Sequence, residues 1–352
     1  SVFDQCRCFG DIKELPSGFN LDTYNQMSHH FLYSIIEPDF FVSTPWRSCL
    51  VENQVVIWMS DEKNAPEGFF DEAGNASIEK VVQRFVVILL HAEMGGYNWK
   101  ESSGWLTPTD VCEWHGIVCR QLSQVGEINL ENNDLQGAIP HHLQHLNLMR
   151  ELSLSGNPRI QGTIPPSLLR SRSLNTLDLK NCGITGTLPS FEEARQLDSF
   201  IVQNNSITGQ IPTTFGTRLR QIVLSDNALS STIPFEIGNL NATLVTLEIG
   251  NNKLSGTLSE SLSSLTRLEI LGLEKNRLTG TIPSGFVDLV DLQSLSLHNN
   301  QFTGTIPLFL EELTQLSFLS LSGNDIQGEV TEEFCATGFR EIVLVDCKGL
   351  SA

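Results

Sequence analysis

Basic residues are scarce in this chain of 352 residues, which holds 22 Lys and Arg against 41 Asp and Glu for a formal net charge of −19. A protein that binds nucleic-acid phosphates needs a stripe of Lys and Arg on its surface. No such stripe occurs, so nucleic-acid partners are excluded. Anionic membrane surfaces are disfavoured for the same reason.

Long apolar runs and catalytic signatures are also missing. A helix that spans a bilayer needs about 20 apolar residues, and the apolar run at 85–90 is much shorter. The chain has no nucleophile elbow, no glycine-rich phosphate loop and no HExxH pattern. Acidic residues are abundant, but no pair falls in a recognisable cleft. We therefore predict that the protein is not an enzyme and needs no cofactor.

Histidines form one cluster, His141, His142 and His145, in a segment that follows an Ile-Pro pair. A zinc site built on such spacing normally adds Glu or Cys ligands, and none is adjacent. We predict a solvated face here and no metal site; the pair His29-His30 is a weaker candidate still.

A repeat dominates what is present, and its clearest copy is the segment 268–283, LEILGLEKNRLTGTIP. Asn or Cys recurs every 22 to 25 residues, at positions 133, 157, 182, 205, 227, 252, 276, 300, 324 and 347. A fixed period in this range predicts a solenoid, in which each turn buries its apolar side by stacking on its neighbours. The count gives about ten turns.

Each turn begins with alternating leucines, which predict a strand with one buried face and hence a stacked parallel sheet. Leu271 and Leu273 are predicted to point to the core, whereas Ile270, Gly272 and Glu274 are predicted to face solvent on a concave side. The Asn that follows is expected to satisfy backbone groups where the chain leaves the strand. Cys182 replaces this Asn and is predicted to be a buried thiol outside the disulfides.

The second half of each turn, as in Phe302-Thr-Gly304-Thr-Ile306-Pro307, resembles the plant-type extracellular leucine-rich repeat over residues 125–331. The resemblance implies an α/β solenoid wound as a right-handed superhelix, with a second short sheet and disulfide-closed caps at both ends. Ser231 stands where the pattern has Gly, and Ser259 stands where it has Pro.

The segments outside the repeats carry their own signals. Apolar residues recur at helical spacing from Ile78 to Leu90, between Ser77 and Gly95-Gly96, which predicts an amphipathic helix. Cys112 and Cys119 around Trp114-His-Gly116 match the disulfide-closed N-terminal cap of plant-type repeats. Together with Val81–Phe85, Trp99, Trp105-Leu106 and Asp346-Cys347, they resemble repeat proteins of diatoms and algae. Cys335 and Cys347 flank the last strand and are expected to close the C-terminal cap.

We therefore expect four segments: a partly helical extension at 1–76, an N-terminal cap at 77–122, repeats at 123–333 and a C-terminal cap at 334–352. Eight cysteines favour an oxidising compartment. Cys49 is expected to pair with Cys6 or Cys8, and the sequence does not choose between them. The glycosylation sequons at Asn75, Asn204 and Asn241 agree with secretion. No signal peptide precedes Ser1, which suggests a mature or trimmed chain, and any membrane anchor would follow Ala352.

Ligand recognition must be sought on the solvent-facing positions of the sheet. An acidic zone is expected at Glu127, Glu131 and Glu151, and an exposed apolar pair at Ile201 and Val223. Phe318, flanked by small Ser320 and followed by Val343 and Val345, predicts an apolar end. The full binding set adds Ile270 and His298.

Threonines on both sides of the repeat glycines, such as Thr279 and Thr281, would form a hydroxyl ladder if the turns stack in register. Regular Thr arrays resemble the surfaces of ice-binding solenoids, but β-branched Thr also suits any exposed strand. Ice binding is therefore a third hypothesis.

The main hypothesis is an extracellular receptor-like or adhesive ectodomain, secreted or at the cell surface, that binds a peptide, protein or glycan together with a co-receptor. The second is a soluble secreted inhibitor of enzymes that degrade cell walls. Nucleic acid is excluded as a partner, and membrane contact would occur only through an anchor outside the chain.

Overall fold

The computed structural model describes residues 77–120 and 123–328 in full, together with Tyr24, Met27, Val55, Val56, Met59 and Ser60 and the backbone of β19 (Glu341–Val343). Four of the predicted features lie outside the described residues: the Cys335–Cys347 pair, the pairing of Cys49, the sequon at Asn75, and Val345. The chain divides into two compact units, Ser1–Leu174 and Asn175–Ala352. The four-segment division of the chain stays a prediction.

The first unit is built around the predicted amphipathic helix, which is α5 (Ile78–Glu93). Apart from Val82, its side chains from Val81 to His91 are buried. The other helices of the unit are η3 (Gly96–Asn98), η4 (Val111–Glu113), η6 (His141–His145) and α6 (Pro166–Leu169). Strand β1 (Ile117–Cys119) runs antiparallel to β2 (Val125–Asn129), which pairs in parallel with β4 (Glu151–Ser153). A small second sheet joins β3 (Gln136–Gly137) to β5 (Arg159–Ile160).

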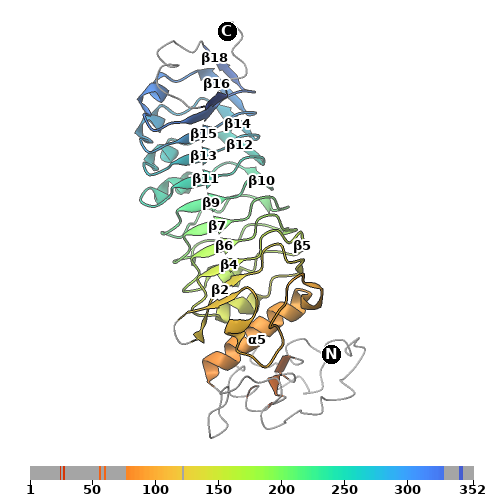
Figure 1. Ribbon diagram of the computed structural model, residues 1–352. Coiled ribbons are helices and arrows are strands. Elements are labelled where there is room, and N and C mark those ends of the chain that lie inside the picture. Colours follow the sequence, from red (N-terminus) through yellow and green to blue (C-terminus); the bar gives the residue numbers. More distant parts are fainter. Residues whose placement is uncertain are drawn as a thin grey trace. The chain divides into compact units, whose positions relative to one another are not determined.

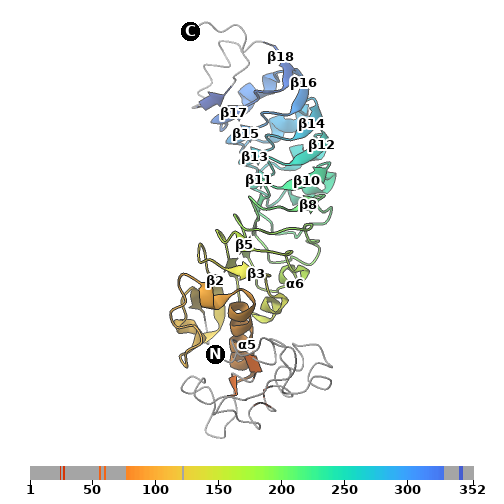
Figure 2. The same ribbon diagram turned by 90° about the vertical axis from the view of Figure 1, so that its right-hand side faces the viewer.

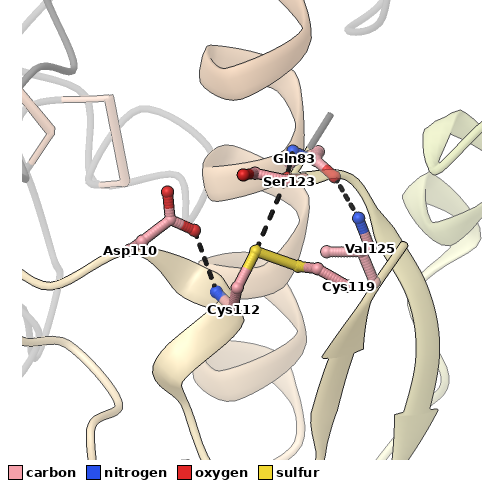
Figure 3. The surroundings of a disulfide bond; sticks show 6 residues. All are labelled: Gln83, Asp110, Cys112, Cys119, Ser123 and Val125. Atoms are coloured by element: carbon pink, nitrogen blue, oxygen red, sulfur yellow. Dashed lines mark hydrogen bonds between the residues drawn. A yellow bond between two sulfur atoms is a disulfide. The ribbon is translucent and has the colours of Figure 1, made fainter. Parts of the chain in front are cut away.

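A disulfide between Cys112 and Cys119 closes the N-terminal cap, as predicted, with 5.4 Å between the two Cα atoms. Figure 3 shows how the cap is attached to the helix. The side chain of Gln83 on α5 accepts a hydrogen bond from the Val125 N–H and donates one to the Ser123 carbonyl at 3.2 Å. One long side chain thus fixes the helix against the first strand of the repeats.

The second unit is a stack of repeats, whose first strands form one parallel sheet in chain order (Figure 1). This main sheet comprises β6 (Thr176–Asp178), β7 (Ser199–Ile201), β9 (Gln221–Val223), β11 (Thr246–Glu248), β13 (Ile270–Gly272), β15 (Ser294–Ser296), β17 (Phe318–Ser320) and β19. Leu271 and Leu273 are fully buried, as are their equivalents in the neighbouring turns. The leucine alternation therefore predicts the buried face correctly.

A second sheet follows the Asn of each turn in this unit, which confirms the prediction made from the Leu-Thr-Gly-Thr-Ile-Pro phrase. Its parallel strands are β8 (Thr208–Gly209), β10 (Ala228–Ser231), β12 (Lys253–Thr257), β14 (Arg277–Gly280), β16 (Gln301–Thr305) and β18 (Asp325–Gln327). Between a strand of the second sheet and the next strand of the main sheet, four turns contain a 3-10 helix. These helices are η7 (Phe235–Leu240), η8 (Glu260–Ser264), η9 (Ser284–Asp288) and η10 (Leu308–Glu312).

The threonines of the second sheet pack through their methyl groups. Gly280 has a φ of +82°, and a Cβ on it would lie 2.8 Å from the Thr257 methyl group of the preceding turn. Glycine is needed here both for its left-handed backbone and for its missing side chain. The expected continuous hydroxyl ladder is wrong, because the Cα partners of Thr279 are Thr257 on one side and Gln301 on the other.

The Asn column satisfies the backbone of two turns at once. In Asn276, Nδ2 donates to the carbonyls of Leu273 at 3.1 Å and Glu274 at 3.2 Å, and to Ile249 of the preceding turn at 3.1 Å. Its Oδ1 accepts from the Leu254 N–H at 3.0 Å. Asn157, Asn205, Asn227, Asn252, Asn300 and Asn324 repeat the arrangement. The buried Cys182 has only a thiol at this position, which donates to the Lys180 carbonyl at 3.5 Å.

Among the residues that the structure describes, no helix has the length and apolar character needed to cross a bilayer. The longest, α5, has 16 residues.

We predict that Asn276→Ala lowers the free energy of unfolding by roughly 2–4 kcal/mol, because it leaves buried carbonyls and one N–H without partners. Asn276→Asp should be at least as destabilising, since a carboxylate cannot donate to those carbonyls. Exposed Asn239 on η7 offers a control, and Asn239→Ala should change stability by less than about 0.5 kcal/mol. Urea unfolding followed by circular dichroism measures all three, and equal stability of Asn276→Ala and Asn239→Ala would disprove the role of the ladder.

Candidate ligand-binding site

The candidate site lies on the side of the main sheet that points away from the leucine core, called here the open face. Each turn presents three positions on this face. They are the residue before the first core leucine, the residue between the two core leucines, and the residue after the second. From β9 to β17 none of these positions holds Lys or Arg. The residues are Gln221, Val223, Ser225, Thr246, Glu248, Gly250, Ile270, Gly272, Glu274, Ser294, Ser296, His298, Phe318, Ser320 and Ser322.

Two glutamates and two glycines alternate on adjacent turns of this face, and we call these four residues the carboxylate site. Glu248 and Gly250 belong to one turn, and Gly272 and Glu274 to the next, with Glu248 opposite Gly272 in the register of β11 and β13. A Cβ on Gly250 would lie 2.2 Å from Oε1 of Glu274. A Cβ on Gly272 would lie 3.3 Å from Oε2 of Glu274 and 3.4 Å from Cγ of Glu248. The glycines thus provide the space into which both acidic side chains fold.

The electrostatics of the carboxylate site are unfavourable for two ionised groups. Burial, and then the charge of Glu274, raises the pKa of Glu248. Oε2 of Glu274 is buried and has no hydrogen-bond partner within the described part of the chain. Neither carboxylate forms an ion pair with a described residue. Two partly buried like charges without a cation store unfavourable energy that a ligand can release.

Polar and apolar groups surround the carboxylate site on the next turns. His298 follows Glu274 in the same column of the open face, and its Nδ1 lies 3.0 Å from Oγ of Ser296. In the column on the other side, Ile270 is paired with Ser294, and Ser294 with Phe318. Ile270, His298 and Phe318 are each partly exposed. Two members of the predicted binding set, Ile270 and His298, therefore lie next to a carboxylate pair that was not predicted, and Phe318 lies two strands beyond β13.

Other members of the predicted set are less accessible. Ile201 is partly exposed, but its neighbour Val223 is only 4 % exposed, so the predicted exposed apolar pair is wrong. Ser320, which flanks Phe318 in the predicted apolar end, is only 2 % exposed. Val343 is paired through its backbone with Ser320.

The acidic zone of the first unit does come together. Glu127 and Glu151 are Cα partners in adjacent strands, and exposed Glu131 accepts a hydrogen bond from Ser153 at 2.8 Å. Glu127 and Glu151 are partly exposed. This zone remains a candidate contact surface, but it lacks the glycine-made space of the carboxylate site.

The histidine cluster is only in part the solvated face that was expected, because His141 is exposed but His142 is not. His142 is 3 % exposed, with its ring edge-on to Phe85 of α5 at 6.2 Å between centroids. Burial, and then the charges of His141 and His145, lowers the pKa of His142 to about 4. Helix η6 is a 3-10 helix rather than an α-helix, so it directs His142 and not His141 toward α5.

Within the described ranges, potential metal-ligating atoms converge at one place, Asp110 with Cys112 and Cys119. The two sulfur atoms are joined in the cap disulfide and are not thiolate ligands. The carboxylate of Asp110 instead accepts from the Cys112 N–H at 3.0 Å. The donor set does not fit a metal ion.

The two sequon asparagines in the described repeats, Asn204 and Asn241, are both exposed. The side chain of Asn204 donates to Oδ1 of Asn181 at 2.8 Å. Their accessibility is compatible with the predicted glycosylation.

With this geometry in place, comparison with known proteins defines the class of the fold. Residues 242–302 and 266–326 match the family described as leucine rich repeat, and residues 173–192 and 218–240 match a second description of the same repeat. The fold is therefore the leucine-rich repeat solenoid that the sequence predicts.

Particular relatives are plant receptors. The chain is 36% identical over 189 residues to phytosulfokine receptor 1 of Arabidopsis thaliana, a match that covers 52% of this chain and 18% of that protein. It is similar to the crystal structure of the Arabidopsis receptor kinase HAESA ectodomain in complex with an IDA peptide hormone, with a TM-score of 0.66, 27% identity, and 74% and 44% of the two chains covered. HAESA has also been solved with IDA and the co-receptor SERK1.

The ectodomain of the Arabidopsis receptor kinase GASSHO1/SCHENGEN3, solved in complex with CASPARIAN STRIP INTEGRITY FACTOR 2, is similar at a TM-score of 0.62 and 31% identity. That match covers 65% of this chain and 28% of the ectodomain. The chain thus spans less than half the length of these relatives. The likeness supports a plant-type receptor ectodomain; a specific kinship with diatom or algal proteins is not confirmed.

Acid should destabilise the first unit through its buried histidines. Burial lowers the pKa of His91 as well as that of His142 to about 4, against an ordinary value of 6.5. Both contribute stability above pH 6.5, and this is lost as the pH falls toward 4, by up to about 3 kcal/mol for each. His142→Leu should weaken the pH dependence of the urea midpoint between pH 7 and 4, whereas the exposed-site variant His115→Leu should leave it unchanged. Identical pH profiles for wild type and His142→Leu would contradict this account.

The carboxylate site should oppose stability at neutral pH. Because the pKa of Glu248 is raised, the native state favours its protonated form, so the stability this form contributes at low pH is lost as the pH rises through the raised value. Glu248→Gln should therefore raise Tm at pH 7 by roughly 2 °C, with a smaller gain at pH 4. Exposed Glu312 on η10 provides the control Glu312→Gln. A lower Tm for Glu248→Gln than for wild type at pH 7 would show that the pair is not strained.

Proposed function

We propose that the protein is an extracellular recognition module that binds a peptide or protein ligand on the open face of its repeats, at the carboxylate site. The observation that carries the proposal is the pair Glu248 and Glu274, which are partly buried, coupled and without a cation among the described residues. A structure maintained only for packing would not gain from such a pair. Ionisable groups whose pKa is shifted by burial and a neighbouring charge are concentrated at functional sites.

The ligand is expected to present a cationic group at this place, either a Lys or Arg side chain or a peptide N-terminus. Charge-assisted hydrogen bonds between a cation and carboxylates are stronger than neutral ones. The gain is larger where the acceptors are partly desolvated before the ligand arrives. A neutral glycan would leave both charges uncompensated, so the face favours a peptide or protein over a sugar.

Side chains around the pair suit a peptide. Ile270 and Phe318 offer partly exposed apolar surface on one side of the pair, and the Ser296–His298 hydrogen bond offers polar contacts on the other. Within one column of the open face, residues of successive turns lie about 4.8 Å apart, which is the strand spacing. An extended peptide that crosses several strands can therefore contact several turns at once.

The comparisons support this class of ligand. HAESA and GASSHO1/SCHENGEN3 were solved with a peptide hormone and with an integrity factor bound, and one HAESA complex includes a co-receptor. By likeness we infer an extracellular or cell-surface location for this chain and a co-receptor as a further partner. No observation favours the inhibitor of wall-degrading enzymes or the ice-binding protein over this function.

The test uses two synthetic pools of nine-residue peptides that differ only at the central position, Arg in one and Gln in the other, with random flanking residues. The full chain, immobilised, should retain the Arg pool at least about tenfold better, as expected for one charged pair. The double variant Glu248→Gln and Glu274→Gln should lose the preference, Phe318→Ala should weaken retention of both pools, and Glu312→Gln should behave as wild type.

Two kinds of result would contradict the proposal. Equal retention of the two pools by wild type, or an Arg preference that survives in the double variant, would show that the carboxylate site does not select the ligand. Loss of preference in Glu312→Gln as well would reveal unspecific attraction to an acidic protein rather than a site.

A further inference from the structure

Two consecutive turns in the second unit are shorter than their neighbours. The column residues Cys182, Asn205 and Asn227 are 23 and 22 residues apart, whereas the flanking intervals are 25 residues. The missing residues come from the half of the turn that follows the second sheet. The segments 189–198 and 212–220 contain no helix, whereas each of the next four turns has a 3-10 helix there, η7 to η10.

A hollow of about 660 Å³, open to solvent, lies beside these short turns at the end of the second sheet where β8 and β10 run (Figure 2 shows their place). A volume of this size can hold a small ligand of a few rings. Its lining residues are Thr187, Leu188, Ser190, Gly209, Gln210, Pro212, Thr213, Thr214, Ser230 and Ser231. All of them belong to the second unit.

The hollow is neutral and rich in hydroxyl groups. Six of its ten lining residues are Ser or Thr, one is Gln, and none is charged, although the chain carries a net charge of −19. Ser190 and Thr214 form a hydrogen bond with each other at 3.0 Å. The side chains of Thr187, Gln210 and Thr213 have no hydrogen-bond partner within the described part of the chain. They present donors and acceptors together with the apolar surfaces of Leu188 and Pro212.

Ser231 adds an independent observation. It has a φ of +79°, a left-handed conformation in which the equivalent residues of neighbouring turns, Gly209, Gly256 and Gly280, are all glycine. A serine is strained in this backbone, because its Cβ crowds the following carbonyl oxygen. Its exposed hydroxyl lines the hollow and, like Thr187, has no partner among the described residues. Strained residues of this kind concentrate at functional positions.

We propose that this hollow is a binding site for a neutral oligosaccharide. Hydroxyl and amide groups both donate and accept, which matches the hydroxyl groups of a sugar, while Leu188 and Pro212 can cover the apolar C–H face of a ring. The absence of charge in the lining disfavours ionic ligands, since an anion would find no cation and a cation no carboxylate. The site is separate from the carboxylate site in both position and ligand chemistry.

The test is titration calorimetry of the full chain with cellohexaose, laminarihexaose and mannohexaose, and with a galacturonic acid hexamer as the acidic comparator. At least one neutral hexasaccharide should bind, and the acidic one should bind at least about tenfold more weakly because no lining cation compensates its charge. Ser231→Gly should raise Tm by roughly 2–4 °C, because it removes the backbone strain. The same variant should weaken sugar binding by about tenfold, the loss expected from one hydrogen bond in a polar site.

Two controls make the result specific. Thr281→Val removes an exposed hydroxyl directly after β14, outside the hollow, and should leave sugar binding unchanged. Glu248→Gln with Glu274→Gln should also leave it unchanged, so failure of the peptide proposal would not affect this one. The proposal is overturned if no neutral hexasaccharide binds, if the acidic hexamer binds equally well, or if Ser231→Gly gains stability and binds sugar as wild type does.

Discussion

The structure depends on the buried amide that ends the first strand of almost every turn. A solenoid turn must leave its sheet and bend, and at that bend backbone groups would be buried without partners. Asn resolves the problem because one planar group donates to carbonyls of two successive turns and accepts from an N–H. Leucine burial supplies the driving force for stacking, but the amide column determines where each turn bends.

Cys182 shows what this constraint tolerates. A thiol is a small and weak donor, and at this position it donates to the Lys180 carbonyl. The Asn of the following turn, Asn205, still makes its bonds to Leu179 and Val202. One missing amide is therefore a local defect, because each turn of a solenoid contacts only its neighbours.

The sequence predicts the fold well because period and burial are local properties of each repeat. The core leucines, the Asn column, the second sheet, α5 and the Cys112–Cys119 disulfide are all as expected. The candidate site is predicted only in part. Ile270 and His298 lie next to the carboxylate pair, but the pair itself joins Glu248 in one column to Glu274 in the neighbouring column of the next turn. A column-by-column comparison misses this diagonal relation.

The exposure of some side chains was also predicted wrongly, because it depends on packing between turns. Val223 and Ser320 occupy solvent-facing positions in the pattern, yet both are buried. His142 is buried because a 3-10 helix turns it toward α5, and neither its helix type nor its packing partner follows from spacing alone. The left-handed backbone of Ser231 could be anticipated from the Gly it replaces. The hollow beside it could not, because it depends on how the outer halves of consecutive turns differ in length.

The unequal length of the turns has a wider consequence. Deleting two residues between one Asn and the next strand leaves the strand register of the main sheet intact, as the pairing of β7 with β9 shows. Loss or gain of residues in the outer half of a turn can therefore remodel the flank of the molecule without moving any group on the open face. The two surfaces are free to diverge separately, so a scaffold of this kind can acquire a second specificity while keeping its first.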